Sequence, residues 1–332
     1  MIAAGTGSRD KLKPRHDTTW SNTKPMSVAA RVQPDDFFSP EEWQQLTARS
    51  SWKGVALVVH CWVVIAVAIA AGVIWPLSIP LMVLLIGNRQ LGLFILMHDA
   101  AHGLLHANRR INDGLARWFC GSELTIYRPY HLQHHRFVQQ SEDPDLVLSA
   151  PFPVTPGSLR RKIVRDLTGQ TFFKQRFGQL ADKLKRRQRG ESPWPLIASE
   201  AGHQRVFFIS NALGLALFSA AGLGWAWLLM WLLPMATWLP LVSRLRNIAE
   251  HALIAQNGTD PLRHARTTRA NWLERLFIAP YWVNYHGEHH MFTQIPCWSL
   301  PHAHRLLTER RVTERMEVQP GYATVIRLAS GA

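Results

Sequence analysis

Four long apolar stretches constrain this chain more than any other feature of its sequence. They run from Val55 to Trp75, Leu81 to Met97, Val206 to Leu223 and Trp225 to Val242. Their lengths fall within the range of about 17–25 residues that an α-helix needs to cross a bilayer. The linker PLSIP joins the first pair, and little more than Gly224 joins the second. The sequence therefore predicts an all-α integral membrane protein with four spans in two transmembrane helical hairpins.

Polar residues interrupt the second stretch, where Asn88, Arg89 and Gln90 are consecutive. A charged side chain in the middle of a span is costly in lipid and usually faces protein or a water-filled cavity. We expect Arg89 and Gln90 to line such a cavity or to make a polar contact between helices. The competing interpretation of all four stretches is that they are buried core helices of a soluble protein.

The basic residues favour the membrane interpretation. Of 37 Lys and Arg residues, eight precede the first stretch, 17 lie between the hairpins, 11 follow the fourth, and neither hairpin tip has any. Cytoplasmic segments of membrane proteins are enriched in Lys and Arg in this way. Both termini and the middle segment should therefore be cytoplasmic. The basic residues follow topology rather than forming one domain, so a nucleic-acid role for the net charge of +14 is not expected.

This topology divides the chain into five parts. A cytoplasmic N-terminal segment (1–50) precedes the first hairpin (51–105), and a second cytoplasmic segment (106–204) leads to the second hairpin (205–245). The C-terminal cytoplasmic segment (246–332) completes a helical cap. The basic stretch from Lys174 to Gly190 is interpreted either as a membrane-facing segment or as a solvated helix.

Histidines concentrate in the cytoplasmic parts. The pattern H-x-x-H-H occurs in HLQHH and again in HGEHH, HDAAH closes the second span, and one further histidine follows the fourth span. Offsets of three and four residues put histidines on one face of a helix. Topology brings nine of them to one side of the membrane: His98, His102, His131, His134, His135, His251, His286, His289 and His290.

Nine histidines on one side predict a histidine-rich dimetal site. Neutral imidazole is a common ligand of transition metals, and nine ligands are too many for one ion but suit two. The three cysteines lie far apart and no H-E-x-x-H motif occurs, which argues against thiolate sites and zinc proteases. Ordinary roles are expected for the histidines without paired spacing: His16, His203, His264, His302 and His304.

HDAAH, HLQHH and HGEHH, in this order around two hairpins, resemble the three histidine boxes of the membrane fatty acid desaturase superfamily, especially its bacterial members. The resemblance extends from about Val55 to Leu307. It implies a non-heme di-iron centre held by the nine histidines, with O2 as co-substrate. It also implies localisation in the bacterial inner membrane with the active site on the cytoplasmic side.

The resemblance suggests further roles around the metal site. The stretch NIAEH resembles an N-x-x-x-H motif in which the Asn acts through water, so Asn247 is a candidate for this role. Arg246, Glu250 and His251 also resemble the Arg and the Glu-His pair found at this point in bacterial relatives. Carboxylates commonly orient histidine ligands. By their position in the sequence, four carboxylates are candidates for this role: Asp99, Asp143, Glu250 and Glu288.

The expected function is desaturation of a lipid acyl chain, with electrons from an external donor of the ferredoxin or cytochrome b5 type, because the chain contains no redox-cofactor motif. The donors are acidic, and the basic cytoplasmic face would attract either them or anionic lipid. Two alternatives within the superfamily are a hydroxylase or ketolase, for example of carotenoids, and a desaturase of a small amino-acid-derived substrate of the dihydrorhizobitoxine type. A membrane metal-binding or transport protein is the non-enzymatic alternative.

Overall fold

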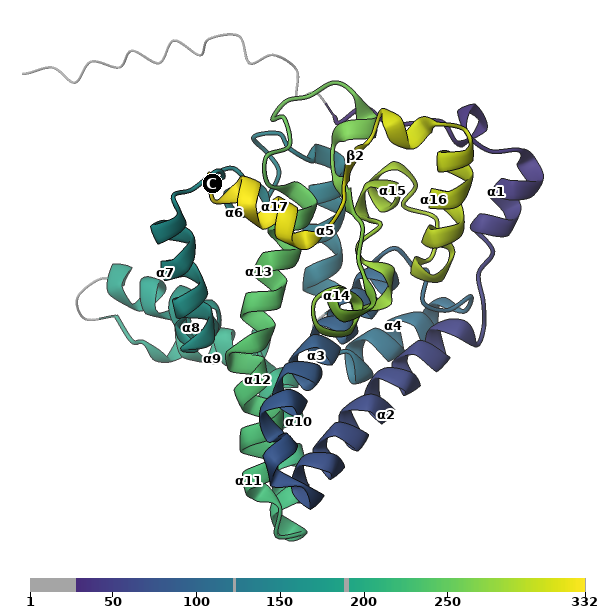
Figure 1. The fold of residues 1–332 in the computed structure, drawn as a ribbon. Coiled ribbons are helices and arrows are strands. Elements are labelled where there is room, and N and C mark those ends of the chain that lie inside the picture. Colours follow the sequence, from purple (N-terminus) through teal and green to yellow (C-terminus); the bar gives the residue numbers. More distant parts are fainter. Residues whose placement is uncertain (1–27, 122–123, 188–190, 332) are drawn as a thin grey trace, which may run out of the picture.

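The computed structural model describes residues 28–121, 124–187 and 191–331. The chain is mainly helical, with long helices converging at the lower end and shorter helices forming a cap above them (Figure 1). Three helical segments of the described chain are long and apolar enough to cross a bilayer: Lys53–Ile74, Pro76–Ala101 and Gly224–His251.

The first hairpin consists of α2 (Lys53–Ile74) and α3 (Ile79–Ala101), joined by the 3-10 turn η2 (Pro76–Ser78). The helices lie side by side along their length (Figure 1). One face of α2 packs inward through Val58, Cys61 and Ile65, whereas Val59 and Val63 are more than half exposed on the other face. Exposed β-branched residues along a whole helix face are the arrangement expected for contact with lipid.

The second hairpin departs from the expected pair of equal spans. Helix α10 (Arg205–Ala220) has 16 residues, or about 24 Å, and is shorter than the other three segments. It packs against α11 (Gly224–Trp227), where a Cβ on Gly214 would lie only 2.1 Å from the Trp227 ring. Glycine is therefore required there for the close approach of the two helices.

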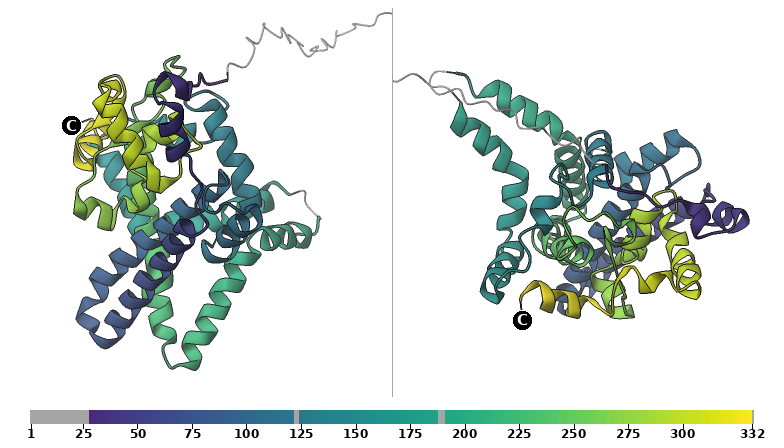
Figure 2. Two further views of the ribbon diagram at one scale, coloured as in Figure 1. Left: turned by 90° about the vertical axis from the view of Figure 1, so that its right-hand side faces the viewer. Right: turned by 90° about the horizontal axis from the view of Figure 1, so that it is seen from above.

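The fourth apolar stretch is a broken helix. It continues from α11 through a π-helical turn, η3 (Leu228–Leu232), into α12 (Leu233–Ala236) and α13 (Trp238–His251). Pro234 follows the π-turn, and Thr237 leaves the helical conformation with φ −122° and ψ −67°. Proline lacks an N–H donor and clashes with the preceding turn, which accounts for the break. Figure 2 shows the two hairpins as separate pairs of helices below the cap.

The polar residues of the second span make contacts between helices. Asn88 Nδ2 donates to Leu276 O at 2.6 Å, and Gln90 Nε2 donates to Trp231 O at 2.8 Å. The Arg89 guanidinium lies 5.4 Å from the centre of the Tyr281 ring. All three polar side chains are buried. Gln90 therefore makes a polar contact between helices and also lines a cavity, whereas Arg89 stacks against the aromatic ring of Tyr281.

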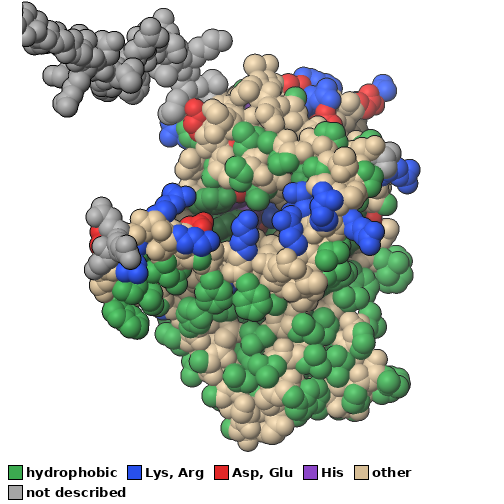
Figure 3. Space-filling model, turned by 90° about the vertical axis from the view of Figure 1, so that its left-hand side faces the viewer, with side chains coloured by type: hydrophobic (Ala, Val, Ile, Leu, Met, Phe, Trp, Pro, Cys, Tyr) green, Lys and Arg blue, Asp and Glu red, His purple; other side chains and the backbone are tan. Residues whose placement is uncertain are grey.

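The middle segment forms shorter helices beside the hairpins. They are α4 (Arg109–Phe119), α5 (Leu124–Phe137), α6 (Leu146–Ser149), α7 (Pro156–Leu167), α8 (Gln170–Arg186) and α9 (Trp194–His203). Helix α4 is amphipathic and exposes Ile111, Trp118 and Phe119. In Figure 3, Lys and Arg side chains form a row at mid-height, above a lower half dominated by hydrophobic side chains.

The C-terminal part completes the cap. Its helices are α14 (Trp272–Phe277), α15 (His286–Met291), α16 (Leu300–Glu309) and α17 (Tyr322–Ala329), with 3-10 turns η4 (Pro261–Arg263), η5 (Pro280–Trp282), η6 (Cys297–Ser299) and η7 (Val312–Glu314). Strands β1 (Arg266–Thr268) and β2 (Glu317–Gln319) pair in parallel and are an exception to the expected all-helical fold. At the N-terminal side, η1 (Pro34–Asp36) and α1 (Pro40–Leu46) dock on α16, where Glu42 pairs with Arg310 at 2.7 Å.

Candidate metal centre

The nine boxed histidines meet at one place in the cap. They come from four helices and the residue that follows one of them: α3 with His102, α5, α13 and α15. Their nitrogens form two groups, and within each group the candidate ligand atoms all lie within 4.8 Å of one another. The first group contains His98, His102, His131, His135 and His289. The second group contains His134, His251, His286 and His290.

The two H-x-x-H-H motifs divide their histidines between the two groups in opposite ways. On α5, His131 and His135 enter the first group and His134 enters the second. On α15 the assignment is reversed, since His289 enters the first group and His286 and His290 enter the second. Residues i and i+4 are about 40° apart around a helix, whereas i+3 lies on the other side of i. One helix with this pattern can therefore reach two ions.

Each hairpin supplies a different group. The end of the first hairpin gives His98 and His102 to the first group, and the end of the second gives His251 to the second group. The cap helices α5 and α15 contribute to both. The centre therefore connects the cap ends of the two hairpins through α5 and α15.

The spacing of the nitrogens fits metal coordination. His131 Nε2 lies 2.9 Å from that of His102 and 3.0 Å from that of His135. His251 Nε2 lies 2.9 Å from that of His286. Two nitrogens bound at right angles to one ion, each at about 2.1 Å, are about 3.0 Å apart. The Nε2 atoms of each group therefore converge as ligands of one ion would.

Burial favours the neutral form of six of these imidazoles. Seven of the nine are buried, and His102 and His290 are half-buried. Burial lowers the pKa of His102 to about 4, and the nearby Arg128 guanidinium lowers it further. Burial and the neighbouring cationic or imidazole groups also lower the pKa well below the ordinary value for His131, His135, His286, His289 and His290. The neutral form is the one that binds metal.

Buried polar atoms without partners support the same interpretation. Within the described chain, His98 Nε2, His251 Nδ1 and Glu250 Oε2 are buried and make no hydrogen bond. Glu250 Oε2 lies 3.4 Å from His286 Nε2, at the edge of the second group. Unsatisfied buried atoms are rare because each one costs free energy. A cation in each group would give His98 Nε2 and Glu250 Oε2 the partner that the protein does not provide.

Comparison with known proteins agrees with this geometry. The profile of the fatty acid desaturase family matches residues 74–319, a range that contains all nine histidines. The chain belongs to the fatty acid desaturase family. It is also 29% identical over 260 residues, 74% of this chain and 70% of the other, to the dihydrorhizobitoxine desaturase of Bradyrhizobium elkanii. The expected membership of the membrane fatty acid desaturase superfamily is therefore confirmed.

Carboxylates hold two of the histidine rings. His134 Nδ1 lies 2.8 Å from Asp143 Oδ1, so its N–H faces the carboxylate and its Nε2 faces the second group. In the first group, His98 Nδ1 lies 3.5 Å from Asp99 Oδ1, and Asp99 Oδ2 accepts a hydrogen bond from Cys297 N at 2.9 Å. Each carboxylate therefore lies beside the Nδ1 atom of a histidine and leaves its Nε2 atom free to bind a metal ion. This is the position expected of a group that orients a ligand.

The second group has a further connection to α5. The backbone N–H of Gln139 donates to Asp143 Oδ2 at 2.9 Å, and Gln139 Nε2 donates to His251 O at 3.0 Å. One glutamine thus links the carboxylate behind His134 to the backbone of His251. Gln139 has a positive φ of 61°, which places its backbone in the left-handed region.

The side chains of two other candidates make no hydrogen bond to a boxed histidine. Glu288 contacts no boxed histidine ring through its side chain: it accepts hydrogen bonds from Thr267 Oγ1 and from His304 Nδ1, the latter at 2.5 Å. His304 therefore has a specific buried partner, which the ordinary role expected for it did not include. The side chain of Asn247 is half-buried and makes no hydrogen bond with any described residue, whereas Arg246 Nε donates to Glu250 Oε1 at 2.7 Å.

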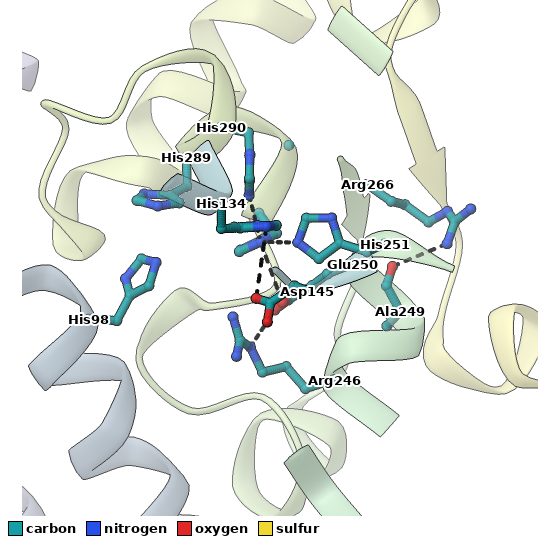
Figure 4. A network of polar contacts seen from close by, with 12 residues as sticks. His98, His134, Asp145, Arg246, Ala249, Glu250, His251, Arg266, His289 and His290 are labelled. Atoms are coloured by element: carbon teal, nitrogen blue, oxygen red, sulfur yellow. Dashed lines mark hydrogen bonds and ion pairs between the residues drawn. The ribbon is translucent and has the colours of Figure 1, made fainter. Parts of the chain in front are cut away.

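Figure 4 shows how these residues lie relative to one another. His98 extends from α3 on one side, near His289, while His134, His251 and His290 turn toward a common centre beside Glu250. Among the other histidines, His264 Nε2 donates to Gly258 O at 3.1 Å, outside both groups. His16 and the side chain of His203 lie outside the described residues.

Arginine side chains bind backbone carbonyls at the C-terminal ends of α3 and α13, the helices that carry His98 and His251. At the end of α3, Arg128 donates to Ala100 O and Ala101 O, each at 3.0 Å. At the end of α13, Arg266 Nη1 donates to Ala249 O at 3.3 Å (Figure 4). Cations stabilise a helix C-terminus because its last carbonyls lack partners. The sequence did not predict the role of these arginines, because a hydrogen bond from a side chain to a distant backbone carbonyl requires no particular residue type at the carbonyl and leaves no sequence motif.

Proposed function

We propose that this protein is an O2-dependent desaturase that introduces a C=C bond into the acyl chain of a membrane lipid. The observation that carries this proposal is the position of both histidine groups, which lie at the ends of apolar helical hairpins. An acyl chain dissolved in the bilayer would approach the centre along these helices. The alternative of a metal transporter has less support, because its ligands should lie inside the spans along a pathway.

We assign two non-heme iron ions to the two groups, held by the nine histidines. When bound, such ions supply activation of O2 and removal of hydrogen from an unactivated C–H bond. The residues of the chain hold and orient the centre. Asp99 and Asp143 fix ring orientation, Glu250 directs its unpartnered Oε2 toward the second group, and Asn247 acts through water. Glu288 supports α15 through its contacts to Thr267 and His304.

We infer a four-span topology with the five-part division 1–50, 51–105, 106–204, 205–245 and 246–332. The cap and both termini lie in the cytoplasm of a bacterial cell and the hairpins cross the inner membrane. Exposed tryptophans support a membrane boundary at the base of the cap, where aromatic residues are enriched. They are Trp52 at the start of α2, Trp118 near the end of α4, Trp194 at the start of α9 and Trp272 at the start of α14.

Reporter fusions test this topology. Fusions after Pro76 and near Gly224 should report a location outside the cytoplasm, and fusions near Gly190 and at the C-terminus should report a location inside it. An outside signal at Gly190 would contradict the topology, because α5 and α15 could then not share one metal centre.

One alternative substrate class has direct support. The similarity to a dihydrorhizobitoxine desaturase favours a small amino-acid-derived substrate as the second candidate. Lipid profiling of a bacterial host that expresses this protein, compared with a host that expresses His135→Ala, separates the two. New unsaturated acyl species that require His135 would support the acyl substrate. An oxygenated lipid would instead indicate a hydroxylase or ketolase, and an unchanged lipid profile with conversion of a small amino-acid derivative would support the second candidate.

An external electron donor is part of the proposal. Reduction of O2 to two waters takes four electrons, of which the substrate supplies two. A ferredoxin or a cytochrome b5-type protein would deliver the other two on the cytoplasmic face. The basic residues that we assign to its docking lie on α7 and at the end of α8: Arg160, Arg161, Lys162, Arg186 and Arg187.

Salt dependence tests this assignment. In detergent without anionic lipid, donor-dependent activity should fall as salt screens the charges. Replacement of Arg186 and Arg187 by Glu should lower the activity further. Activity that is insensitive to both changes would instead assign these basic residues to contact with anionic lipid.

A further inference from the structure

Two adjoining cavities lie below the metal centre, between α3, α8 and α12. Their volumes are about 420 Å³ and 120 Å³. They share the lining residues Phe94, Arg176, Met235 and Leu239, so we treat them as one space, the α3–α8 cavity. Phe94 is four residues before His98 on α3, which is about 6 Å along the helix axis. The cavity therefore lies about one helical turn from His98 of the first histidine group.

The two parts of the cavity differ in character. The smaller part is lined mainly by apolar side chains, including Leu93, Trp118 and Trp231. The larger part contains polar groups, among them Gln175, Glu200 and Gln204. Ligand sites commonly combine an apolar wall with a few polar groups that fix orientation.

Arg176 is the cation that both parts share, and it has no acidic partner. Its Cζ lies 4.0 Å from the centre of the Phe207 ring and 5.8 Å from that of Phe172. No carboxylate of the described chain forms an ion pair with it. Glu200, which also lines the cavity, is instead contacted by Lys183 Nζ at 3.4 Å and by Gln204 Nε2 at 3.2 Å. Burial alone lowers the pKa of the Arg176 guanidinium.

An unpaired, half-buried guanidinium favours an anion. Burial of a charge is costly unless an opposite charge or hydrogen bonds compensate it. Arginine offers planar, paired donors that match a carboxylate or a phosphate. The stacking of Arg176 on Phe207 holds the guanidinium in place at the cavity wall.

We propose that the α3–α8 cavity binds an anionic amphiphile, with its carboxylate or phosphate on Arg176 and its apolar chain against Phe94, Met235 and Leu239. This inference rests on the proposed function, because it makes the amphiphile the substrate and Arg176 the residue that recognises its charged end. The chain then extends toward His98, and the position of the anion sets which carbon reaches the metal centre.

Equilibrium binding to the purified full-length protein in neutral detergent tests the proposal without turnover. The probes are palmitate, lysophosphatidic acid with the same acyl chain, and methyl palmitate, which has the chain but no charge. At least one anion should bind about tenfold or more tightly than the methyl ester, the size of effect expected for a charge-assisted hydrogen bond. The anion that binds more tightly identifies a free fatty carboxylate or a lipid phosphate as the source.

Matched variants test whether Arg176 causes the preference for the anion. Arg176→Gln should abolish the preference for the anion while leaving binding of the methyl ester unchanged, and Arg176→Lys should restore part of it. Arg165→Gln, at an exposed arginine of α7 outside the cavity, should leave the preference intact. If Arg176→Gln does not fold, the affinities for the anion and for the methyl ester are compared between the wild-type and Arg176→Lys proteins instead. Equal affinity of the wild-type protein for acids and ester, or an unchanged preference in an Arg176 variant, would overturn the proposal.

The outcome is separable from that of the proposed function. A protein that desaturates lipids but binds acid and ester equally would contradict the role of Arg176 alone. A protein that prefers the anion through Arg176 but changes no lipid would contradict the proposed desaturation alone.

Discussion

The first histidine group takes two ligands, His98 and His102, from the end of the first hairpin, whereas the second takes one, His251, from the end of the second. The first group thus has five imidazoles and the second has four. Beside the second group stands a carboxylate oxygen without a partner, Glu250 Oε2, 3.4 Å from His286 Nε2.

This difference shows that one sequence motif can build two unequal sites. The pattern H-x-x-H-H supplies three imidazoles from α5 and three from α15, divided two and one in opposite senses. What distinguishes the groups therefore comes from outside the motif, namely from the hairpin ends and from Glu250. We expect metal affinity at the first group to depend on imidazoles alone, and metal affinity at the second group to depend also on the Glu250 carboxylate.

Removal of one imidazole from each group should have the largest effect. His135→Ala and His290→Ala should each lower the metal content from about two ions per chain to about one. Loss of a residue that hydrogen-bonds to a metal ligand typically lowers activity roughly 10–100-fold. Loss of a ligand itself should lower turnover by more than that. Metal analysis of the purified protein and a desaturation assay measure both. His302→Ala, on α16 outside both groups, is the control, and an equal loss there would contradict the division.

Glu250→Gln should weaken the second group selectively. The substitution keeps the shape of the side chain but removes its charge, so metal affinity of the second group should fall about 10–100-fold while the first group is unchanged. Titration of metal-free protein with Fe²⁺ under anaerobic conditions, in wild type and variant, gives the two affinities. Asp99→Asn should change only the first group; a loss in both groups from either substitution would show that the groups are not independent.

Asp143→Asn should have a smaller effect, about tenfold in turnover. The Asn Oδ1 can still accept the N–H of His134, but without a charge it holds the imidazole less strongly. Comparison with Asp143→Ala sharpens the assignment, because Ala removes the acceptor entirely and should cost more. If both substitutions have equal effects, Asp143 contributes through folding rather than through the orientation of His134.

His304→Ala should affect stability more than chemistry. It leaves the buried Glu288 carboxylate with Thr267 as its remaining side-chain partner, which should lower the free energy of unfolding by about 1–3 kcal/mol. Metal content and turnover at low temperature should stay within about threefold of wild type. Thermal unfolding in detergent measures the first effect. Loss of metal without loss of stability would assign His304 to the metal centre instead.

Residue spacing together with the predicted topology indicated which histidines meet. Offsets of three and four residues determine that His131, His134 and His135 share one side of a helix, and the distribution of Lys and Arg predicts the side of the membrane. Spacing alone could not predict how each motif divides its histidines between the two groups, because the choice of ion depends on the relative rotation of α5 and α15. That rotation is set by tertiary packing.

Other features were missed for a common reason. Arg128, Arg266 and Gln139 act on backbone carbonyls of residues far away in the sequence. Such contacts need no particular partner residue type, so no pattern indicates them. Helix α10 was overestimated because hydropathy continues past Ala220, where Gly222, with a φ of 72°, ends the helix.

The placement of α15 has a consequence for the order of events during synthesis. His289 completes the first group and His286 and His290 complete the second, and all three are made after both hairpins. A ribosome-bound chain that has just produced α13 carries four nitrogen ligands of the first group and two of the second. Neither group can therefore have its full set of histidines until α15 has been made, and we expect membrane insertion to precede metal loading.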